Sequence, residues 1–199
     1  MKKRLKSIIL CHIFLPFQAL AQMHTDDMNY WIEKYQSVSY PLKSIHISSS
    51  YGKRADPFTG KGRFHQGIDL EAKYEVVFAM FDAEIKRVGY DPMSGNFITL
   101  KAGNYTISYC HLSEIWVKED ELVYAGQELG RSGSTGRATG PHLHISCRLH
   151  GKIENPYHLL TFVRDTQLKA VDALGLNKDV KLSPEDFLRT YAPQAMKQQ

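Results

Sequence analysis

The chain has no hydrophobic run long enough to span a membrane. Of its 199 residues, the first six are rich in lysine and arginine, and Ile8–Leu20 is apolar but shorter than a membrane-spanning helix. Ala19-Leu20-Ala21 supplies the small residues that a signal peptidase requires. This pattern predicts a secretory signal peptide over residues 1–21, with no membrane span left after its removal.

An excess of charge of one sign is also lacking once that segment is removed. Residues 1–21 contain four of the 25 lysines and arginines and no acidic residue, which leaves 21 basic and 21 acidic residues. No basic block remains, so the sequence gives no reason to expect nucleic-acid binding. At 43% hydrophobic and 23% charged residues, the chain is expected to fold as an ordinary globular protein.

Repeats, low-complexity tracts and flexible interdomain linkers are absent from the sequence, which favours one domain with appendages. Between residues 46 and 156, short apolar runs alternate with turn signals every 8–12 residues. Strands are predicted at 76–79, 84–88, 96–101 and 105–111, with Gly103-Asn104 as a tight hairpin turn between the last two. The fold class is therefore predicted as mainly β, with an antiparallel sheet.

Helical periodicity is confined to the two ends of the chain. Met28, Trp31, Ile32 and Tyr35 recur at helical spacing and predict a short amphipathic helix that packs on the body, within an N-terminal segment of residues 22–45. A C-terminal helical extension is expected over residues 157–199. Its first helix should end at Gly175, and a second should begin at the Ser183-Pro184 cap signal.

The first chemical signal is the pair His142–Leu143–His144, which follows a run rich in glycine and threonine. In a strand, residues two apart point to the same side, so both imidazoles can face one metal ion, or one can bind it while the other acts beside it. A second signal is His65 and Asp69 in "RFHQGIDLEA". If this stretch is extended, His65, Gly67 and Asp69 share one face while Ile68 and Leu70 share the other.

Together these pairs offer three imidazoles and one carboxylate, and catalytic zinc sites usually take three protein ligands. A further histidine, His111, stands at the end of a predicted strand, and strand parity predicts that Ile107, Tyr109 and His111 share a face. No HExxH motif is present, so no glutamate of that kind can act as a base.

These motifs, in their order and separation, resemble the lysostaphin/LytM family of zinc peptidoglycan endopeptidases. The motifs are His-x-x-x-Asp, Tyr-x-His-Leu-Ser and Ser-Thr-Gly-x-x-Thr-Gly-Pro-His-Leu-His, and the resemblance runs from Ser50 to Pro156. It implies a LytM-like zinc peptidase domain at residues 46–156. It also implies that His65, Asp69 and His144 bind one zinc ion (Zn2+) per chain, and that His111 and His142 are catalytic residues beside the metal.

The resemblance implies a secreted zinc metallo-endopeptidase that hydrolyses peptide cross-links or stem peptides of bacterial peptidoglycan. Two alternatives stay open: a catalytically silent regulator that binds and activates another wall hydrolase, and a peptidase of soluble proteins. Degenerate ligands and a long coiled coil would mark the regulator, and the sequence has neither. We expect a monomer in the periplasm, with release from the cell as the alternative location.

The sequence departs from the family pattern at several positions. Tyr74-Glu75-Val76-Val77 replaces a usual Gly-Thr-Pro-Val, Ser146 replaces a frequent acid, and Cys110 replaces a small apolar residue. These changes bear on the shape of the groove rather than on activity. Strand parity predicts that Cys110 and Cys147 both face away from the site, either as a disulfide or as two buried free thiols.

Overall fold

The computed structural model describes residues 25–174. The predicted signal peptide and the helix predicted at Ser183 lie outside this range. The described residues form a helix over residues 25–36, the helix α2 (Tyr157–Ala173) and thirteen strands. The strands are β1 (Ile47–Ser49), β2 (Gly52–Ala55), β3 (Gly62–His65), β4 (Ile68–Glu71), β5 (Val76–Phe78), β6 (Ala83–Asp91), β7 (Gly95–Ala102), β8 (Tyr105–Leu112), β9 (Glu114–Ile115), β10 (Leu122–Val123), β11 (Glu128–Arg131), β12 (His142–Leu149) and β13 (Lys152–Glu154).

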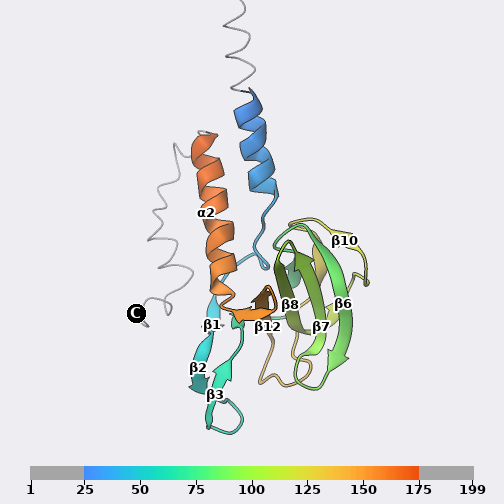
Figure 1. The fold of residues 1–199 in the computed structure, drawn as a ribbon. Helices are drawn as coiled ribbons and strands as arrows, with labels where there is room; N and C mark the ends of the chain where they lie inside the picture. The colour runs from blue at the N-terminus through green and yellow to red at the C-terminus, as the bar shows by residue number, and fades with distance from the viewer. Residues whose placement is uncertain (1–24, 175–199) are drawn as a thin grey trace, which may run out of the picture.

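The main sheet runs in the order β1-β4-β12-β8-β7-β6-β10, and β13 pairs with β12. All of its pairings are antiparallel, which confirms the predicted fold class (Figure 1). A smaller sheet has the order β5-β11-β9, and β2 and β3 form a two-stranded hairpin of their own. The four strands predicted in the middle of the chain are present as β5 to β8.

The hydrophobic core lies on one face of the main sheet. Alternation places Ile68 and Leu70 of β4, and Leu143 and Ile145 of β12, in this core with at most 1% of each side chain exposed. Residues of the smaller sheet and of the start of α2 complete the same cluster. Their neighbours in sequence, Asp69, His142 and His144, therefore point to the opposite face, as the period of two requires.

Strand β8 breaks this alternation near its end. Ile98 is paired with Tyr109 but Asn96 with Leu112, so Cys110 and His111 together oppose Phe97 in a β-bulge. His111 adopts a left-handed backbone with a φ of 64°. The prediction that Ile107, Tyr109 and His111 share a face is therefore wrong, because Ile107, Tyr109 and Leu112 face the core.

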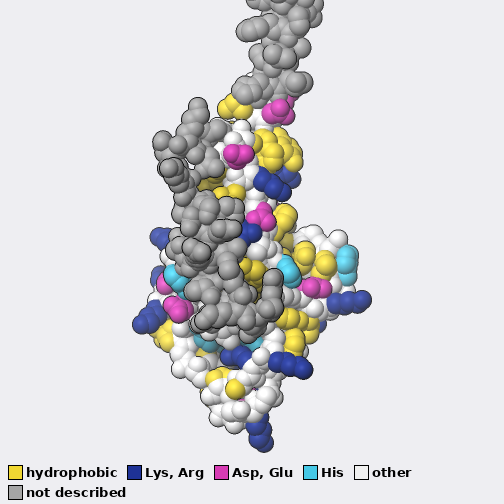
Figure 2. Space-filling view, turned by 90° about the vertical axis from the view of Figure 1, so that its left-hand side faces the viewer, with side chains coloured by type: hydrophobic (Ala, Val, Ile, Leu, Met, Phe, Trp, Pro, Cys, Tyr) yellow, Lys and Arg dark blue, Asp and Glu magenta, His cyan; other side chains and the backbone are white. Residues whose placement is uncertain are grey.

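The two helices lie side by side and extend away from the sheets (Figure 1). Of the three predicted helices, the two that fall within residues 25–174 exist. The N-terminal one leaves most of its apolar residues exposed, since Met28, Ile32 and Tyr35 are 42%, 39% and 45% exposed and Trp31 alone of the predicted stripe is half-buried. Figure 2 shows hydrophobic side chains along this helical part and lysines and arginines spread singly below it. Neither described helix is long and apolar enough to cross a membrane.

Candidate metal centre

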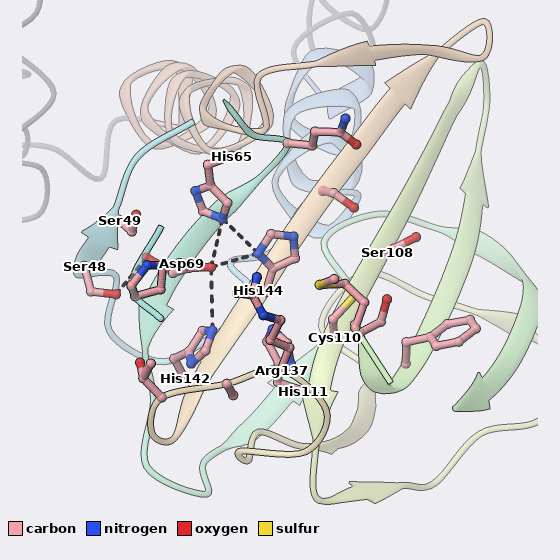
Figure 3. Close-up of a pocket in the computed structure, with 18 of the residues that line it drawn as sticks. Ser48, Ser49, His65, Asp69, Ser108, Cys110, His111, Arg137, His142 and His144 are labelled. Carbon is pink, nitrogen blue, oxygen red and sulfur yellow. Dashed lines mark hydrogen bonds and ion pairs between the residues drawn. The ribbon is translucent and has the colours of Figure 1, made fainter. Parts of the chain in front are cut away.

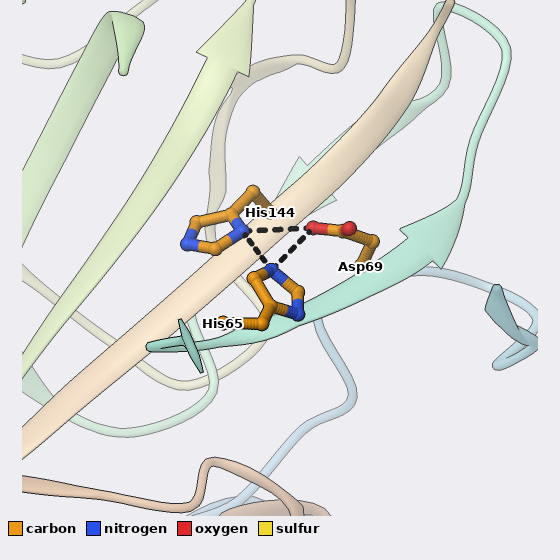
Figure 4. A group of neighbouring side chains, drawn as sticks. All are labelled: His65, Asp69 and His144. Carbon is orange, nitrogen blue, oxygen red and sulfur yellow. Dashed lines mark hydrogen bonds and ion pairs between the residues drawn. The ribbon is translucent and has the colours of Figure 1, made fainter. Parts of the chain in front are cut away.

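His65, Asp69 and His144 come from three strands and meet at one point. Asp69 and His144 are directly opposed in the β4–β12 pair, so the sheet register itself brings the carboxylate to the imidazole. His65 is the last residue of β3 and lies three residues before β4, so it reaches the same place from the hairpin side. Figure 4 shows the three side chains pointing toward one another.

The facing atoms of these residues form a tight triangle. Asp69 Oδ1 lies 2.8 Å from His144 Nδ1 and 3.2 Å from His65 Nε2, and the two nitrogens are 3.2 Å apart. Zinc–nitrogen bonds of usual length in a tetrahedral site would place two ligand nitrogens about 3.3 Å apart. The two nitrogens and one carboxylate oxygen thus fit the donor set and spacing of a zinc site, and the three residues form a group that could hold a metal ion.

The neighbours of the triangle orient two of its members. The Nδ1 of His65 donates a hydrogen bond to the carbonyl of Ser50 at 2.9 Å, which leaves the Nε2 lone pair free to face the triangle. Arg54 donates through Nη2 to Asp69 Oδ2 at 3.3 Å, so the second carboxylate oxygen is held away from the triangle. Such contacts typically set the orientation and strength of metal ligands.

Gly67 makes room for the ring of His144. A Cβ placed on Gly67 would lie 2.5 Å from Cε1 and 2.6 Å from Nε2 of His144, and 2.4 Å from the carbonyl oxygen of Ile145. Distances this short are not found in real structures, so any side chain here would displace the ring or the strand. The glycine in "HQGID" is therefore part of the site.

His111 and His142 lie beside the triangle on the same face of the sheet (Figure 3). Their ring centroids are 4.7 Å apart, and the His111 ring is 5.8 Å from that of His144. His142 Nε2 is 3.7 Å from Asp69 Oδ1. The HxH pair thus places both imidazoles at one site, as strand parity predicts, with His144 in the triangle and His142 next to it.

Backbone carbonyls of one loop determine which nitrogen of each of these histidines carries the proton. The Nδ1 of His111 donates to the carbonyl of Thr135, and the Nδ1 of His142 donates to that of Gly140, both at 2.8 Å. A carbonyl oxygen can only accept, so each Nδ1 is protonated and each Nε2 is left to exchange a proton in the groove.

Burial and hydrogen bonding set the charges in the site. Burial opposes the negative charge of Asp69, but the hydrogen bond from His144 and the interaction with the nearby His65 imidazole outweigh it and hold the pKa of the carboxyl far below its usual value. Burial lowers the pKa of His111 to about 4, and burial also lowers the pKa of His144. At neutral pH the site therefore contains the Asp69 carboxylate and the neutral imidazoles of His111 and His144, the forms that bind metal and accept protons.

A groove of about 890 Å³ surrounds these residues. Hairpin residues, the loop before β12 and the outer face of the sheet line it, and it contains His65, Asp69, His111, His142 and His144. Five side chains predicted from widely separated motifs are thus brought together in one groove.

Cys110 lies in this groove rather than on the far face. Because Tyr109 faces the core, alternation along β8 turns Cys110 to the side of the site, directly opposite His144, whereas Cys147 belongs to the core. The prediction that both cysteines face away is wrong for Cys110. Both are buried free thiols, which agrees with the second of the two alternatives and not with a disulfide.

Several residues of the site carried no signal in the sequence. The carbonyls of Thr135 and Gly140 act through the backbone, so their side-chain types do not reveal them. Arg54 is recognisable only from its contact with Asp69 in the folded chain. The bulge did leave a trace, because apolar residues 107, 109 and 112 are spaced by two and then by three.

Comparison with protein families gives a match to the model described as peptidase family M23 over residues 63–156. The matched range begins in the hairpin and ends just before α2, and it includes all five residues of the groove named above.

Among curated proteins, peptidoglycan DD-endopeptidase ShyC of Vibrio cholerae is 35% identical over 119 residues, which are 58% of this chain and 28% of that protein. The chain spans a third or less of the length of curated relatives that it matches.

Two solved structures have a similar fold. A zinc-containing peptidase from Vibrio cholerae is 31% identical with a TM-score of 0.56, over 60% of this chain and 39% of that one. The catalytic domain of the antimicrobial peptidase lysostaphin from Staphylococcus simulans is 30% identical with a TM-score of 0.54. The match covers 59% of this chain and 92% of the lysostaphin domain.

Proposed function

Because the chain belongs to peptidase family M23, we propose that it is a zinc metallo-endopeptidase that hydrolyses peptide cross-links or stem peptides of bacterial peptidoglycan. The observation that carries the proposal is the convergence of His65, Asp69 and His144 on one point, with the imidazoles of His111 and His142 beside it. The name of the Vibrio cholerae relative supports a D,D cross-link as the bond that is cut.

His65, Asp69 and His144 would hold one zinc ion per chain. When bound, such an ion supplies Lewis-acid chemistry: it polarises a carbonyl and lowers the pKa of a water molecule. The carboxyl of Asp69 has a strongly lowered pKa and burial lowers the pKa of His144, so these two donors already have their metal-binding forms at neutral pH.

His111 and His142 would carry the proton transfers. Each has its Nδ1 proton fixed by a loop carbonyl, so each Nε2 is free to accept a proton from the attacking water or to donate one to the leaving amine. A protonated imidazole can also donate to the oxyanion of the tetrahedral intermediate. Two imidazoles next to the triangle provide for both tasks without a glutamate base.

A peptidoglycan substrate would require the enzyme to act outside the inner membrane, and the predicted signal peptide supports a periplasmic location as part of the proposal. The alternative of a silent regulator is not favoured, since none of the three metal-binding residues or the two histidines is replaced. We also propose that the protein is a monomer.

Mass spectrometry of purified peptidoglycan after digestion tests the function. We expect cross-linked muropeptides to be converted to monomers by the zinc-loaded protein and to persist when a chelator is present. Intact cross-links and stem peptides after digestion with fully zinc-loaded protein would contradict the proposal.

His142→Ala is the matched control, because it leaves the three metal-binding residues in place. We expect one zinc ion per chain and a loss of turnover on the order of 10²- to 10⁴-fold, the usual cost of removing one acid–base or oxyanion group. If this variant lost its zinc instead, the assignment of His142 as a non-ligand would be wrong.

A further inference from the structure

The β2–β3 hairpin, residues 52–65, is attached to the rest of the described chain mainly by side chains. It forms a separate two-stranded sheet, and among residues 25–174 no backbone–backbone hydrogen bond joins it to another element. Yet it ends in His65, one of the three metal-binding residues, and its side chains line the groove. The orientation of the hairpin, and of the strand that ends in His65, therefore depends in part on contacts made by side chains of the hairpin.

Asp56 makes the most extensive of these contacts. This residue is only 5% exposed, and its Oδ1 accepts hydrogen bonds from the amides of Phe58 and Thr59 at 3.0 Å within the hairpin. Arg63, also in the hairpin, donates to Oδ2 at 3.0 Å. Burial opposes the charge of Asp56, but these amides and the Arg137 guanidinium outweigh it, so the pKa of the carboxyl lies below its ordinary value.

Arg137 connects the hairpin to the other side of the groove. It donates through Nη1 to Asp56 Oδ2 at 3.0 Å and through Nη2 to Asp56 Oδ1 at 2.9 Å, a bidentate pair. Its guanidinium also lies 4.4 Å above the ring centroid of Phe58. The Asp56–Arg137 pair therefore crosses the groove from the hairpin to the loop of residues 132–141.

That loop has the two carbonyls that fix His111 and His142, and it is anchored on the main sheet. The amide of Arg137 donates to the carbonyl of Met93 at 3.1 Å, and the amide of His142 donates to that of Gly133 at 3.0 Å. The Asp56–Arg137 pair thus joins the element that carries His65 to the element that orients the other two histidines.

We propose that Asp56 and Arg137 are positioning residues, whose ion pair holds the β2–β3 hairpin against loop 132–141 and so fixes His65 relative to His111 and His142. The alternative is that Arg137 binds a carboxylate of the substrate. Both of its terminal nitrogens already donate to Asp56 and its face lies on Phe58, so the charge is satisfied within the protein. The expected effect of this ion pair on kcat rests on the proposed function, whereas its expected effect on the position of the hairpin does not.

Pulsed electron paramagnetic resonance measures the hairpin position directly. Spin labels would be attached at Lys61→Cys, near the tip of the hairpin, and at Leu122→Cys, on the exposed edge strand β10, in zinc-loaded protein with Cys11→Ser. Cys110 and Cys147 are buried and should stay unlabelled. We expect a single narrow distance distribution in the parent protein and a broadened or shifted one in Arg137→Met.

Arg63→Met is the control, since it removes a guanidinium from the same carboxylate, together with the exposed 3.4 Å contact of Arg63 with the Met93 sulfur, without cutting the bidentate pair across the groove. It should leave the distribution narrow. Arg137→Lys keeps the charge but not the bidentate geometry, and it should fall between the parent and Arg137→Met. This variant also serves if Arg137→Met does not fold.

Kinetics on muropeptides separate positioning from substrate binding. With zinc retained, Arg137→Met should lower kcat by about 10- to 100-fold, because a misplaced group far from the chemistry can cost that much, while KM changes little. A distance distribution in Arg137→Met that is the same as in the parent protein would overturn the proposal. Equal broadening in Arg137→Met and Arg63→Met would overturn it as well. A raised KM with unchanged kcat would also overturn it, in favour of substrate binding by Arg137. If the parent protein cleaves nothing, the resonance result still decides the structural claim.

Discussion

Asp69 uses its two carboxylate oxygens for different partners. Oδ1 faces the imidazoles of His65 and His144, and Oδ2 accepts from Arg54. This arrangement presents one oxygen to a metal ion and keeps the carboxylate plane fixed, as is common for ligands with a hydrogen-bonded outer partner.

Loss of any one of the three ligands should abolish tight zinc binding. In His65→Ala, Asp69→Ala and His144→Ala two protein ligands remain, and two ligands cannot retain zinc with high affinity. Elemental analysis after dialysis should give well under one zinc ion per chain for each variant. A full zinc content in Asp69→Ala would refute the assignment.

Gly67→Ala should damage the site without altering any ligand. The added methyl would meet the His144 ring and the Ile145 carbonyl at 2.4–2.6 Å, so we expect a loss of about 1–3 kcal/mol in the free energy of unfolding and weaker zinc binding. Chemical denaturation and zinc titration measure both. Gly62→Ala is the control, because a Cβ there has nothing within 4 Å; equal effects in the two variants would contradict the steric argument.

His111 should make the metal-free protein less stable in mild acid. Burial lowers the pKa of His111 to about 4 in the folded protein, below the value of 6.5 expected in the unfolded chain. Between these values the unfolded state binds more protons, so stability is full above about pH 6.5 and falls as the pH drops toward 4. His144, with its pKa also lowered by burial, contributes in the same direction.

Thermal unfolding in the presence of a chelator tests this pH dependence. Between pH 7 and 5 the Tm of the parent protein should fall, and His111→Gln should reduce the fall without removing it. Asp69 contributes in a different pH range. Folding lowers the pKa of its carboxyl, so this group reduces stability only when the pH falls below the ordinary pKa of an aspartate. A slope unchanged in His111→Gln would show that His111 does not take part.

At the scale of elements, the bulge in β8 matters most for the site. Without the extra residue, a strand that places Ile107 and Tyr109 in the core would also turn position 111 toward the core. The bulge brings Cys110 and His111 to the groove together and returns Leu112 to the core. Bulges are known to redirect side chains next to active sites, and here one redirects His111.

We expect the helix α2 to have a structural role, because one of its faces is buried in the core. Leu159, Leu160 and Val163 belong to the core cluster, whereas Phe162 between them is 57% exposed. Leu160→Ala should cost about 2–5 kcal/mol in the free energy of unfolding, and Phe162→Ala much less. Denaturant titration compares the two, and equal losses would contradict this packing.

Truncation after Tyr157 should lower solubility rather than alter cleavage specificity, while a soluble and hyperactive truncated chain would indicate an inhibitory tail.

At the scale of the whole molecule, a bound metal would connect two separate sheets. His65 belongs to the hairpin sheet, whereas Asp69 and His144 belong to the main sheet. A ligand that binds only the folded state stabilises it by about 2.7 kcal/mol at a hundred times its Kd. For a chain of this size we expect that removal of zinc lowers Tm by roughly 5–10 °C. Calorimetry with and without chelator measures this change, and an unchanged Tm would contradict a zinc ion shared between the sheets.

The sequence by itself determined the antiparallel β class and the five histidine and aspartate residues of the groove. Alternation with a period of two places Ile68 and Leu70 in the core, which forces Asp69 outward, and the same rule puts His142 and His144 on one face. These are local properties, since the direction of a side chain along a regular strand depends only on its neighbours.

Only the tertiary structure decided the register, the bulge and the contacts between loops. The pairing of Asp69 with His144 joins residues that are 75 positions apart, and the Asp56–Arg137 contact joins residues that are 81 apart. Ile107 and Tyr109 of β8 face the core rather than the site, so Cys110 faces the groove, and one inserted residue brings His111 to the same side. Exposure of the N-terminal helix also contradicted its pattern. In each case the outcome depends on which distant segment is adjacent in space, and periodicity along the chain contains no information about that.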